Sequence, residues 1–148
     1  MAFVPDDFHV PAGLEADGFL LEPLGTEHNV DDHEAWSSSI EHIRATPGFP
    51  DGNWPRTMTL DENRADLERH ARDFAERDGF TYTVLDPSDR RVIGCVYIYP
   101  DMSGRHDAEV ASWVRVTHAE RDAPLRTLVS RWLDEAWPFE RVAYAGRA

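Results

Sequence analysis

The spacing of apolar residues along the chain predicts three helical segments. Apolar positions three and four residues apart indicate one helix over residues 59–79 and another from about Pro124 to Pro138. A further helical face, over residues 26–45, is marked by Trp36 and Ile43, with Ile40 between them. The apolar stripes of the two longer helices are Leu60, Leu67, Ala71 and Phe74, and Leu125, Leu128, Val129, Trp132, Leu133 and Ala136.

Polar residues and glycine predict where two of these helices begin or end. Thr59 and Glu62 have the spacing of a capping box, in which each side chain bonds to the other residue's backbone N–H. Gly79 is a reasonable C-terminal stop for the same helix. Asp31 or Asp32 is expected to cap the first helix.

Runs of β-branched, aromatic and alternating residues predict five strands. These strands cover residues 19–24, 80–86, 91–100, 108–116 and 141–148. The second and third are joined by the turn PSDR and form an antiparallel hairpin, and the fourth continues the meander. The last helix would then cross over to a fifth strand that runs parallel to the fourth. The predicted fold is a mixed α+β sheet.

The strand over residues 108–116 has two distinct faces, because successive side chains of a strand alternate. One face would carry Glu109, Ala111, Trp113 and Arg115, and the other Val110, Ser112, Val114 and Val116. Residues 1–18 contain two prolines and two glycines among acidic residues and are expected to be an irregular arm. Residues 19–148 are expected to form a single domain.

The charge balance limits the partners. The chain has 28 acidic and 15 basic residues, a net charge of −13. This charge repels phosphate backbones, so nucleic acid is not an expected partner. It favours cationic ligands such as amines or basic peptides, although acidity that serves solubility alone is the other interpretation.

The N-terminal residues and the single cysteine bear on location. The sequence MAFVPDDFHV has no secretory signal pattern, and no apolar run approaches the ~20 residues of a membrane span. Cys95 excludes a disulfide framework or a thiolate zinc site within one chain. We therefore expect a soluble, cytoplasmic protein that makes no contact with a membrane.

The order of elements, with the stretches TVLDPSDRRVIG, VIGCVYIYP and AEVASWVRV, resembles the GCN5-related N-acetyltransferase (GNAT) superfamily. The resemblance spans roughly Phe19 to Arg147. It implies an acyl-CoA N-acyltransferase fold in which strands 2 to 4 are antiparallel and strands 4 and 5 are parallel. It also implies transfer of an acyl group from acetyl-CoA, without a metal, to a primary amine on a small molecule or peptide.

The resemblance also implies where the coenzyme would bind. Members of the family usually carry Arg/Gln-x-x-Gly-x-Gly/Ala after strand 4, where backbone N–H groups at a helix N-terminus hold the pyrophosphate. The matching stretch here, AERDAPL or ERDAPLR, has no glycine. Pro124 lacks an N–H, and Asp122 is placed to act as an N-cap that would compete with a phosphate. The residues expected at the coenzyme are Val114, Arg115, Val116, Arg121, Ala123, Leu125 and Arg126.

Two residues are candidates for the chemistry that the resemblance implies. Glu109 is the candidate base, since a carboxylate with a raised pKa can take the amine proton, and a solvent-facing glutamate is the alternative. Tyr144 is the candidate acid for the thiolate leaving group, with packing as the alternative. A non-catalytic domain that kept the fold and lost CoA use is the competing hypothesis for the whole chain.

Several further groups have open roles. Tyr97 and Tyr99 share a strand face with Cys95, and either line a substrate cleft or pack the sheet; the cysteine is expected to be inert. The aromatic residues Trp36, Phe49 and Trp54 either shape an acceptor pocket or belong to the core. The run HNVDDH lacks a third metal ligand at a recognisable spacing, and no metal is expected. The family usually continues past strand 5, so either a homodimer completes the sheet or the domain is a reduced version.

Overall fold

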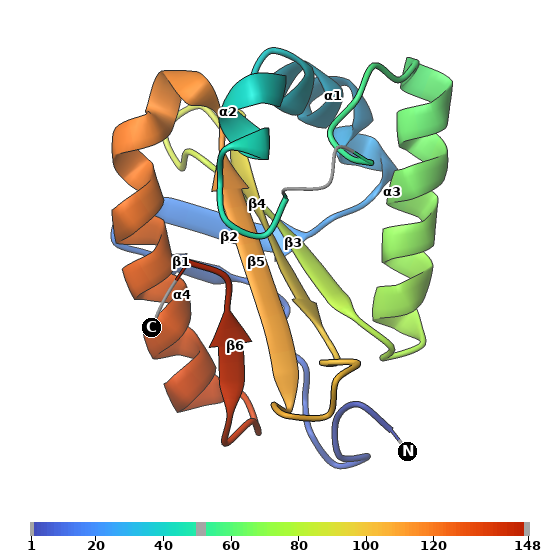
Figure 1. The fold of residues 1–148 in the computed structure, drawn as a ribbon, viewed down its shortest axis with the longest axis vertical. Helices are drawn as coiled ribbons and strands as arrows, with labels where there is room; N and C mark the ends of the chain where they lie inside the picture. The colour runs from blue at the N-terminus through green and yellow to red at the C-terminus, as the bar shows by residue number, and fades with distance from the viewer. Residues whose placement is uncertain (1, 50–52, 147–148) are drawn as a thin grey trace.

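The computed structural model describes residues 2–49 and 53–146, which form one six-stranded sheet with helices on both faces (Figure 1). The strands lie in the order in which they occur in the chain. Neighbouring strands are antiparallel except for the last pair, β5 and β6, which is parallel. The elements are β1 (Leu14–Ala16), β2 (Phe19–Pro23), η1 (Thr26–His28), α1 (Asn29–Ser37), α2 (Ile40–Arg44), α3 (Leu60–Ala75), β3 (Phe80–Leu85), β4 (Val92–Tyr99), β5 (Ala108–Val114), η2 (Val116–Arg121), α4 (Asp122–Ala136) and β6 (Val142–Tyr144).

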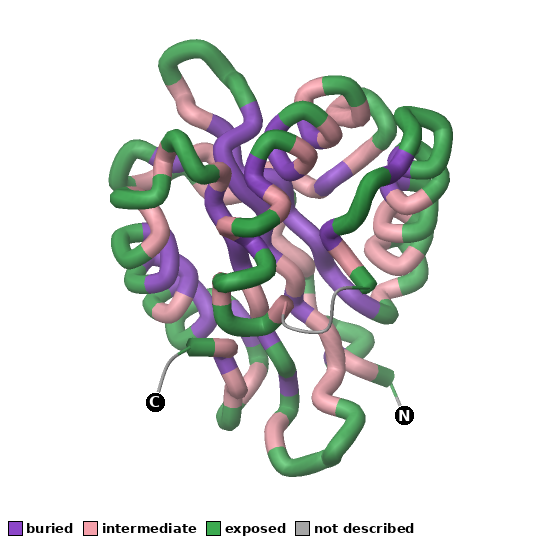
Figure 2. The backbone as a smooth tube through the Cα atoms, turned by 45° about the horizontal axis from the view of Figure 1, so that its top comes forward, coloured by how far each residue is buried: buried purple, intermediate pink, exposed green. Residues whose placement is uncertain are grey.

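The sheet separates two apolar clusters. Helix α4 covers one face through Leu125, Val129 and other residues of its apolar stripe. The helices α1, α2 and α3 cover the other face, where Trp36 and Trp113 are fully buried. Strand β3 is buried on both faces along its whole length, as is most of β4, so the middle of the sheet lies inside the molecule (Figure 2). The mixed α+β sheet and the parallel pair at its end are thereby confirmed.

The segment predicted as a single first helix is broken in two. Helix α1 ends at Ser37 and α2 begins at Ile40. Ser39, which is buried in the break, accepts a hydrogen bond through its Oγ from the backbone N–H of Val116, 2.9 Å away. The prediction that Asp31 or Asp32 caps the helix is wrong, because η1 leads directly into α1 and both residues lie inside the helix.

Helix α3 begins as predicted but ends differently. Thr59 and Glu62 form the capping box, with each side chain bonded to the other residue's N–H. At the other end Arg77, with φ of 63°, takes the left-handed conformation, so Gly79 is not the residue that stops the helix. The absence of a side chain at Gly79 has another cause, because a Cβ there would collide with the ring of Tyr99.

The N-terminal arm is less irregular than predicted. Leu14–Ala16 forms β1, which pairs with β2 through a turn at Asp17 and Gly18, both of which have positive φ. Val4 is buried in the core, although it lies in the irregular part of the arm. The extent of the domain, residues 19–148, stays a prediction. Among the described residues, no helix is long and apolar enough to cross a membrane.

Candidate functional site

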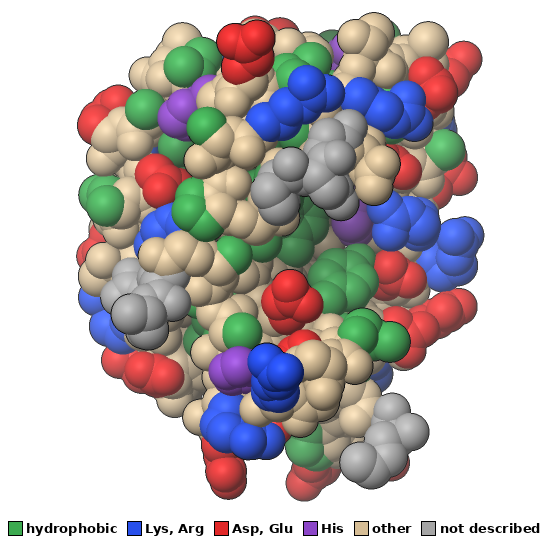
Figure 3. Space-filling model, in the orientation of Figure 1, with side chains coloured by type: hydrophobic (Ala, Val, Ile, Leu, Met, Phe, Trp, Pro, Cys, Tyr) green, Lys and Arg blue, Asp and Glu red, His purple; other side chains and the backbone are tan. Residues whose placement is uncertain are grey.

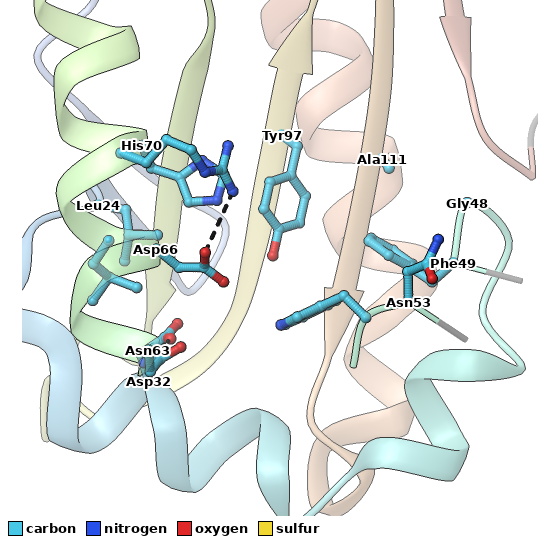
Figure 4. Close-up of a pocket in the computed structure, with 13 residues that line it drawn as sticks. Leu24, Asp32, Gly48, Phe49, Asn53, Asn63, Asp66, His70, Tyr97 and Ala111 are labelled. Atoms are coloured by element: carbon cyan, nitrogen blue, oxygen red, sulfur yellow. Dashed lines mark hydrogen bonds and ion pairs between the residues drawn. The ribbon is translucent and has the colours of Figure 1, made fainter. Parts of the chain in front are cut away.

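A cavity of about 360 Å³ lies between α3, β4, β5 and the loop that follows α2 (Figure 4). Its walls come from segments far apart in the sequence, since α3 contributes Asp66 and His70, and β4 contributes Tyr97. The residues that line it are Leu24, Asp32, Gly48, Phe49, Asn53, Trp54, Asn63, Asp66, Leu67, Arg69, His70, Tyr97 and Ala111. Figure 4 shows Asp66 and His70 extending from α3 toward Tyr97, with Phe49 on the opposite side.

Aromatic rings form much of the cavity wall. The ring centroids of Phe49 and Trp54 are 5.8 Å apart, and those of Phe49 and Tyr97 are also 5.8 Å apart. Trp36 lies behind this wall with its ring 5.6 Å from that of Trp54, and its Nε1 donates to Asn63 Oδ1. Of the aromatic residues with an open role, Phe49 and Trp54 line the cavity together with Tyr97, whereas Trp36 is part of the core.

Two carboxyl groups reach the same cavity. Asp32 is only 4% exposed, and this burial raises its pKa from 3.8 to about 6. Its Oδ2 accepts a hydrogen bond of 3.1 Å from Asn63 Nδ2. Asp66 is half-buried and makes a loose ion pair of 3.7 Å with Arg69, which is drawn in Figure 4. Negative charge beside aromatic faces suits a positively charged ligand, because ring faces and carboxylates both attract cations.

His70 connects the cavity to a polar network. Its Nδ1 lies 3.0 Å from the Tyr99 hydroxyl and 3.1 Å from Thr81 Oγ1. The Tyr99 hydroxyl donates to Asp73 Oδ2 at 2.9 Å. Burial lowers the pKa of His70 to about 4, with a further contribution from Arg69, so the ring is neutral at pH 7.

The sequence contains a weak signal for the polar residues that α3 contributes to the cavity. Asn63, Asp66 and His70 recur at intervals of three and four along α3, so they share a helical face next to the apolar stripe. Their chemistry becomes apparent only where this face meets Asp32 of α1. Among the residues that the structure describes, no group of three histidine, cysteine, aspartate or glutamate side chains could hold a metal ion.

The two predicted catalytic residues lie elsewhere, beside a second cavity of about 530 Å³ next to β6. Glu109 is exposed on β5 and pairs across the ladders with Tyr99 and Ala143. Tyr144 is buried, and its hydroxyl lies 2.6 Å from Ser112 Oγ. Both residues line this second cavity, and their catalytic roles stay predictions.

Comparison with known proteins identifies the architecture. No protein-family model and no curated protein sequence matches the chain. Among solved structures, the ribosomal-protein-S5-alanine acetyltransferase of Vibrio fischeri superposes with a TM-score of 0.68 at 12% identity, over 90% of this chain and 73% of that chain. The microcin self-immunity acetyltransferase MccE, solved with acetyl-CoA and AMP, has a TM-score of 0.59 at 12% identity, over 84% and 68%. This chain has the GNAT fold.

A further structure of the same fold is a chimaera built on the spermidine N-acetyltransferase of Vibrio cholerae. It has a TM-score of 0.56 at 18% identity, and the match covers 82% of this chain and 64% of that chain. These superpositions, together with the mixed sheet and its parallel last pair in this chain, confirm the predicted GNAT architecture. Identities this low establish the fold alone.

The connection between β5 and α4 differs from the usual GNAT loop. The helix η2 runs directly into α4, and the backbone N–H of Asp122 donates to the carbonyl of Ala119. The prediction that Asp122 is the N-cap is wrong, because Arg121 occupies that position and Asp122 is the first residue of α4. Its carboxylate instead pairs with Arg126 Nε at 2.9 Å. The N–H groups that would meet a pyrophosphate are therefore partly used by the preceding turn.

The three arginines expected at the coenzyme all make bonds within the protein, and their roles toward a coenzyme stay predictions. Arg121 donates to the carbonyl of Gly18 at 2.6 Å, and its guanidinium lies 4.3 Å above the ring of Phe19. Arg126 is buried and donates to the carbonyl of Ala145 as well as pairing with Asp122. The third, Arg115, bonds to Glu34 Oε1 at 2.7 Å and to the carbonyl of Val92 at 3.3 Å.

The other four residues expected at the coenzyme lie in different environments. Val114 is buried on the face of β5 that α4 covers. The N–H of Val116 is occupied by Ser39, as described above. Ala123 is exposed in the first turn of α4, whereas Leu125 is fully buried.

The loop after α2 lies against the point where β5 and β6 diverge. Their ladder ends with the pair Val110 and Tyr144, after which Ala145 N–H still donates to the carbonyl of Val110. Beyond this point Gly48 lies so close that a Cβ on it would be 3.1 Å from the Cβ atoms of Ala111 and Ala145. The loop after α2 therefore packs against both strands where they diverge, at the Ala111 end of the first cavity.

Proposed function

We propose that this protein is an N-acyltransferase that binds a cationic amine in the cavity beside α3 and transfers an acyl group to it. The observation that carries the proposal is the cavity itself, where Asp32 and Asp66 lie among the rings of Phe49, Trp54 and Tyr97. The GNAT fold, which the chain shares with acetyltransferases of known structure, supports the reaction class.

The cavity suits a small amine or the end of a longer cationic chain. An ammonium group placed over an aromatic face and next to a carboxylate gains from both contacts, and the contact with the ring contributes about 0.5–2 kcal/mol, depending on its exposure to water. The net charge of −13 adds a long-range attraction for the same ligands. The acceptor itself is proposed only as a class, a primary amine of a small molecule or peptide.

Acetyl-CoA is the proposed acyl donor, and the residues present fit its two ends differently. Val110 presents its carbonyl to the β6 side, so by alternation Ser112 and Val114 direct their backbone groups to the same side, beyond the end of β6. Such a strand edge can hold the amides of a pantetheine arm. The diphosphate end does not fit this conformation, because η2 and the engaged arginines leave it no cradle.

A second candidate function follows from the same observations. An amine-binding domain that performs no acyl transfer is favoured by the internal bonds of Arg121 and Arg126 and by the packing of Gly48 where β5 and β6 diverge. The two candidates make the same prediction for amines and opposite predictions for the coenzyme.

The deciding experiment measures both ligands on the full chain. An enzyme requires that acetyl-CoA raise Tm and that mass spectrometry detect an acetylated product with at least one member of a panel of polyamines, arylalkylamines and basic peptides. Amine binding together with no effect of acetyl-CoA up to about 1 mM would establish the second candidate. Asp66→Asn is the matched variant, because it removes charge from the cavity and should weaken amine binding without changing any coenzyme effect.

We also propose a cytoplasmic location and no nucleic-acid or membrane partner. The single, buried Cys95 needs no oxidising compartment, and the charge of −13 disfavours polyanions and anionic surfaces. A homodimer along the outer edge of β6 would extend the sheet at its parallel end. Light scattering tests this proposal, since a monomer at all concentrations contradicts it.

A further inference from the structure

The network around His70 determines which of its ring nitrogens carries the proton. Tyr99 has one hydroxyl hydrogen, and this hydrogen is donated to Asp73 Oδ2. Arg69 Nη1 lies 3.9 Å from the same oxygen, and a carboxylate oxygen can only accept a hydrogen bond. The Tyr99 oxygen is then left as an acceptor for His70 Nδ1, 3.0 Å away.

This arrangement favours the proton of the neutral ring on Nδ1, where it faces the oxygens of Tyr99 and Thr81, so that Nε2 carries the lone pair. This is the arrangement by which a second residue fixes the tautomer of a histidine. Among the described residues, Nε2 has no hydrogen-bond partner, and His70 is one of the residues that line the amine cavity. Its ring centroid is 5.7 Å from that of Tyr97, on the cavity wall (Figure 4).

We propose that His70 Nε2 accepts the proton that the acceptor amine loses during acyl transfer, with Tyr99 and Asp73 as positioning residues. This rests on the function proposed above and replaces Glu109 as the base, because Glu109 is not among the residues that line the amine cavity.

The acceptor ammonium first loses one proton to solvent, which leaves a neutral amine with a free electron pair. The amine nitrogen then forms a bond to the acyl carbon of the thioester, the carbon–sulfur bond breaks, and the sulfur leaves with the electron pair as a thiolate. The nitrogen becomes strongly acidic as it bonds to the carbonyl carbon, so its proton passes to a weakly basic, neutral imidazole. Asp66 and Asp73 then offset the charge of the imidazolium until the proton leaves to solvent or to the thiolate.

Groups from three elements face His70 and would influence its titration. Arg69 opposes protonation, and Asp66 and Asp73 favour it. The residues concerned are Asp66, Arg69 and Asp73 on α3, Tyr97 and Tyr99 on β4, and Thr81 on β3.

The first test needs no acyl donor. In a ¹⁵N-histidine-labelled protein at pH 7, long-range ¹H–¹⁵N spectra are expected to show His70 with Nδ1 protonated and Nε2 unprotonated. Spermidine, as the probe amine, is expected to shift the Nε2 resonance, and Tyr99→Phe is expected to give a mixture of tautomers. A wild-type ring with its proton on Nε2, or an Nε2 resonance that the amine does not move, overturns the proposal even if the protein transfers no acyl group.

The second test separates chemistry from binding. His70→Gln is expected to lower kcat at least about 100-fold with the amine KM changed less than about 3-fold, because general-base catalysis contributes at least that much. Tyr99→Phe should lower kcat about 10-fold, and Glu68→Gln, which removes an exposed carboxylate from the same helix, should leave kcat within about 2-fold of wild type. Unchanged kcat in a folded His70→Gln variant overturns the proposal. Failure of the proposed function shows separately, as an absence of transfer in the wild-type protein.

Discussion

Replacing Asp32 with asparagine is expected to stabilise the protein at neutral pH and to leave its stability in acid almost unchanged. Asp32 is 4% exposed, and its pKa is about 6 in the folded chain against 3.8 for an ordinary carboxyl group. At about 1.36 kcal/mol per pKa unit, this rise corresponds to about 3 kcal/mol. Asparagine has a similar shape and can still accept the hydrogen bond from Asn63 Nδ2.

The sign follows from the two pKa values. Because the folded pKa lies above the unfolded one, the folded state binds more protons between pH 3.8 and about 6. The wild-type protein therefore loses stability through this carboxyl group as the pH rises through that window, whereas the Asp32→Asn variant does not. The variant should exceed the wild type by up to about 3 kcal/mol above pH 7 and match it near pH 3.5.

Urea denaturation from pH 3.5 to 8 measures this difference. Only the difference between variant and wild type is interpreted, since His70, with its pKa lowered to about 4, adds a slope of the opposite sign to both proteins. Asp134→Asn, on the exposed face of α4, removes the same charge and is expected to change stability by less than about 0.5 kcal/mol at every pH. A difference for Asp32→Asn that does not grow with pH would refute the reasoning. The stabilised variant should also bind cationic amines more weakly, because it lacks one of the cavity's charges.

Two further substitutions test how the ends of the helices are held. Arg126→Ala removes the buried partner of Asp122 and is expected to lower the free energy of unfolding, measured with urea, by about 2 kcal/mol. Its control, Arg64→Ala, removes one partner of the exposed pair with Glu68 and should lower this free energy by less than about 0.5 kcal/mol. Equal effects of the two substitutions would contradict the inferred role of Arg126. Thr59→Ala breaks the capping box of α3 and should cost about 1 kcal/mol, while Thr57→Ala, exposed and outside the helix, should be near neutral. A Thr59→Ala protein as stable as wild type would show that the cap contributes nothing.

The elements that the sequence predicted well are those whose signal is local. The stripe of α4 from Leu125 to Leu133, the capping box of α3 and the alternation of β5 each depend on neighbours along the chain. The errors arose where distant contacts decide. The break at Ser39 is fixed by a hydrogen bond from Val116, and the three-residue β1 exists because it pairs with β2.

In the candidate site, too, the features that depend on contacts between distant residues could not be predicted from the sequence. The aromatic residues Phe49 and Trp54 could be assigned to a pocket or to the core, but the sequence alone could not choose between them. Asp32 was visible only as a candidate cap, because its burial against Asn63 depends on the packing of α1 on α3. The hydrogen bond from Arg121 to Gly18 could not be foreseen for a similar reason, since the two residues lie 103 positions apart in the chain.

The position of one short loop links two places that have been described separately. Gly48 packs against Ala111 and Ala145 where β5 and β6 diverge, and the next residue, Phe49, forms part of the cavity wall. These residues are covalent neighbours, so a ligand that displaces one must move the other. The free energy of ligand binding in the cavity and the free energy of ligand entry between β5 and β6 are therefore coupled. The coupling acts equally in both directions. An amine that holds Phe49 in place would oppose entry of an acyl donor, and a donor that enters first would change the affinity for the amine by the same factor.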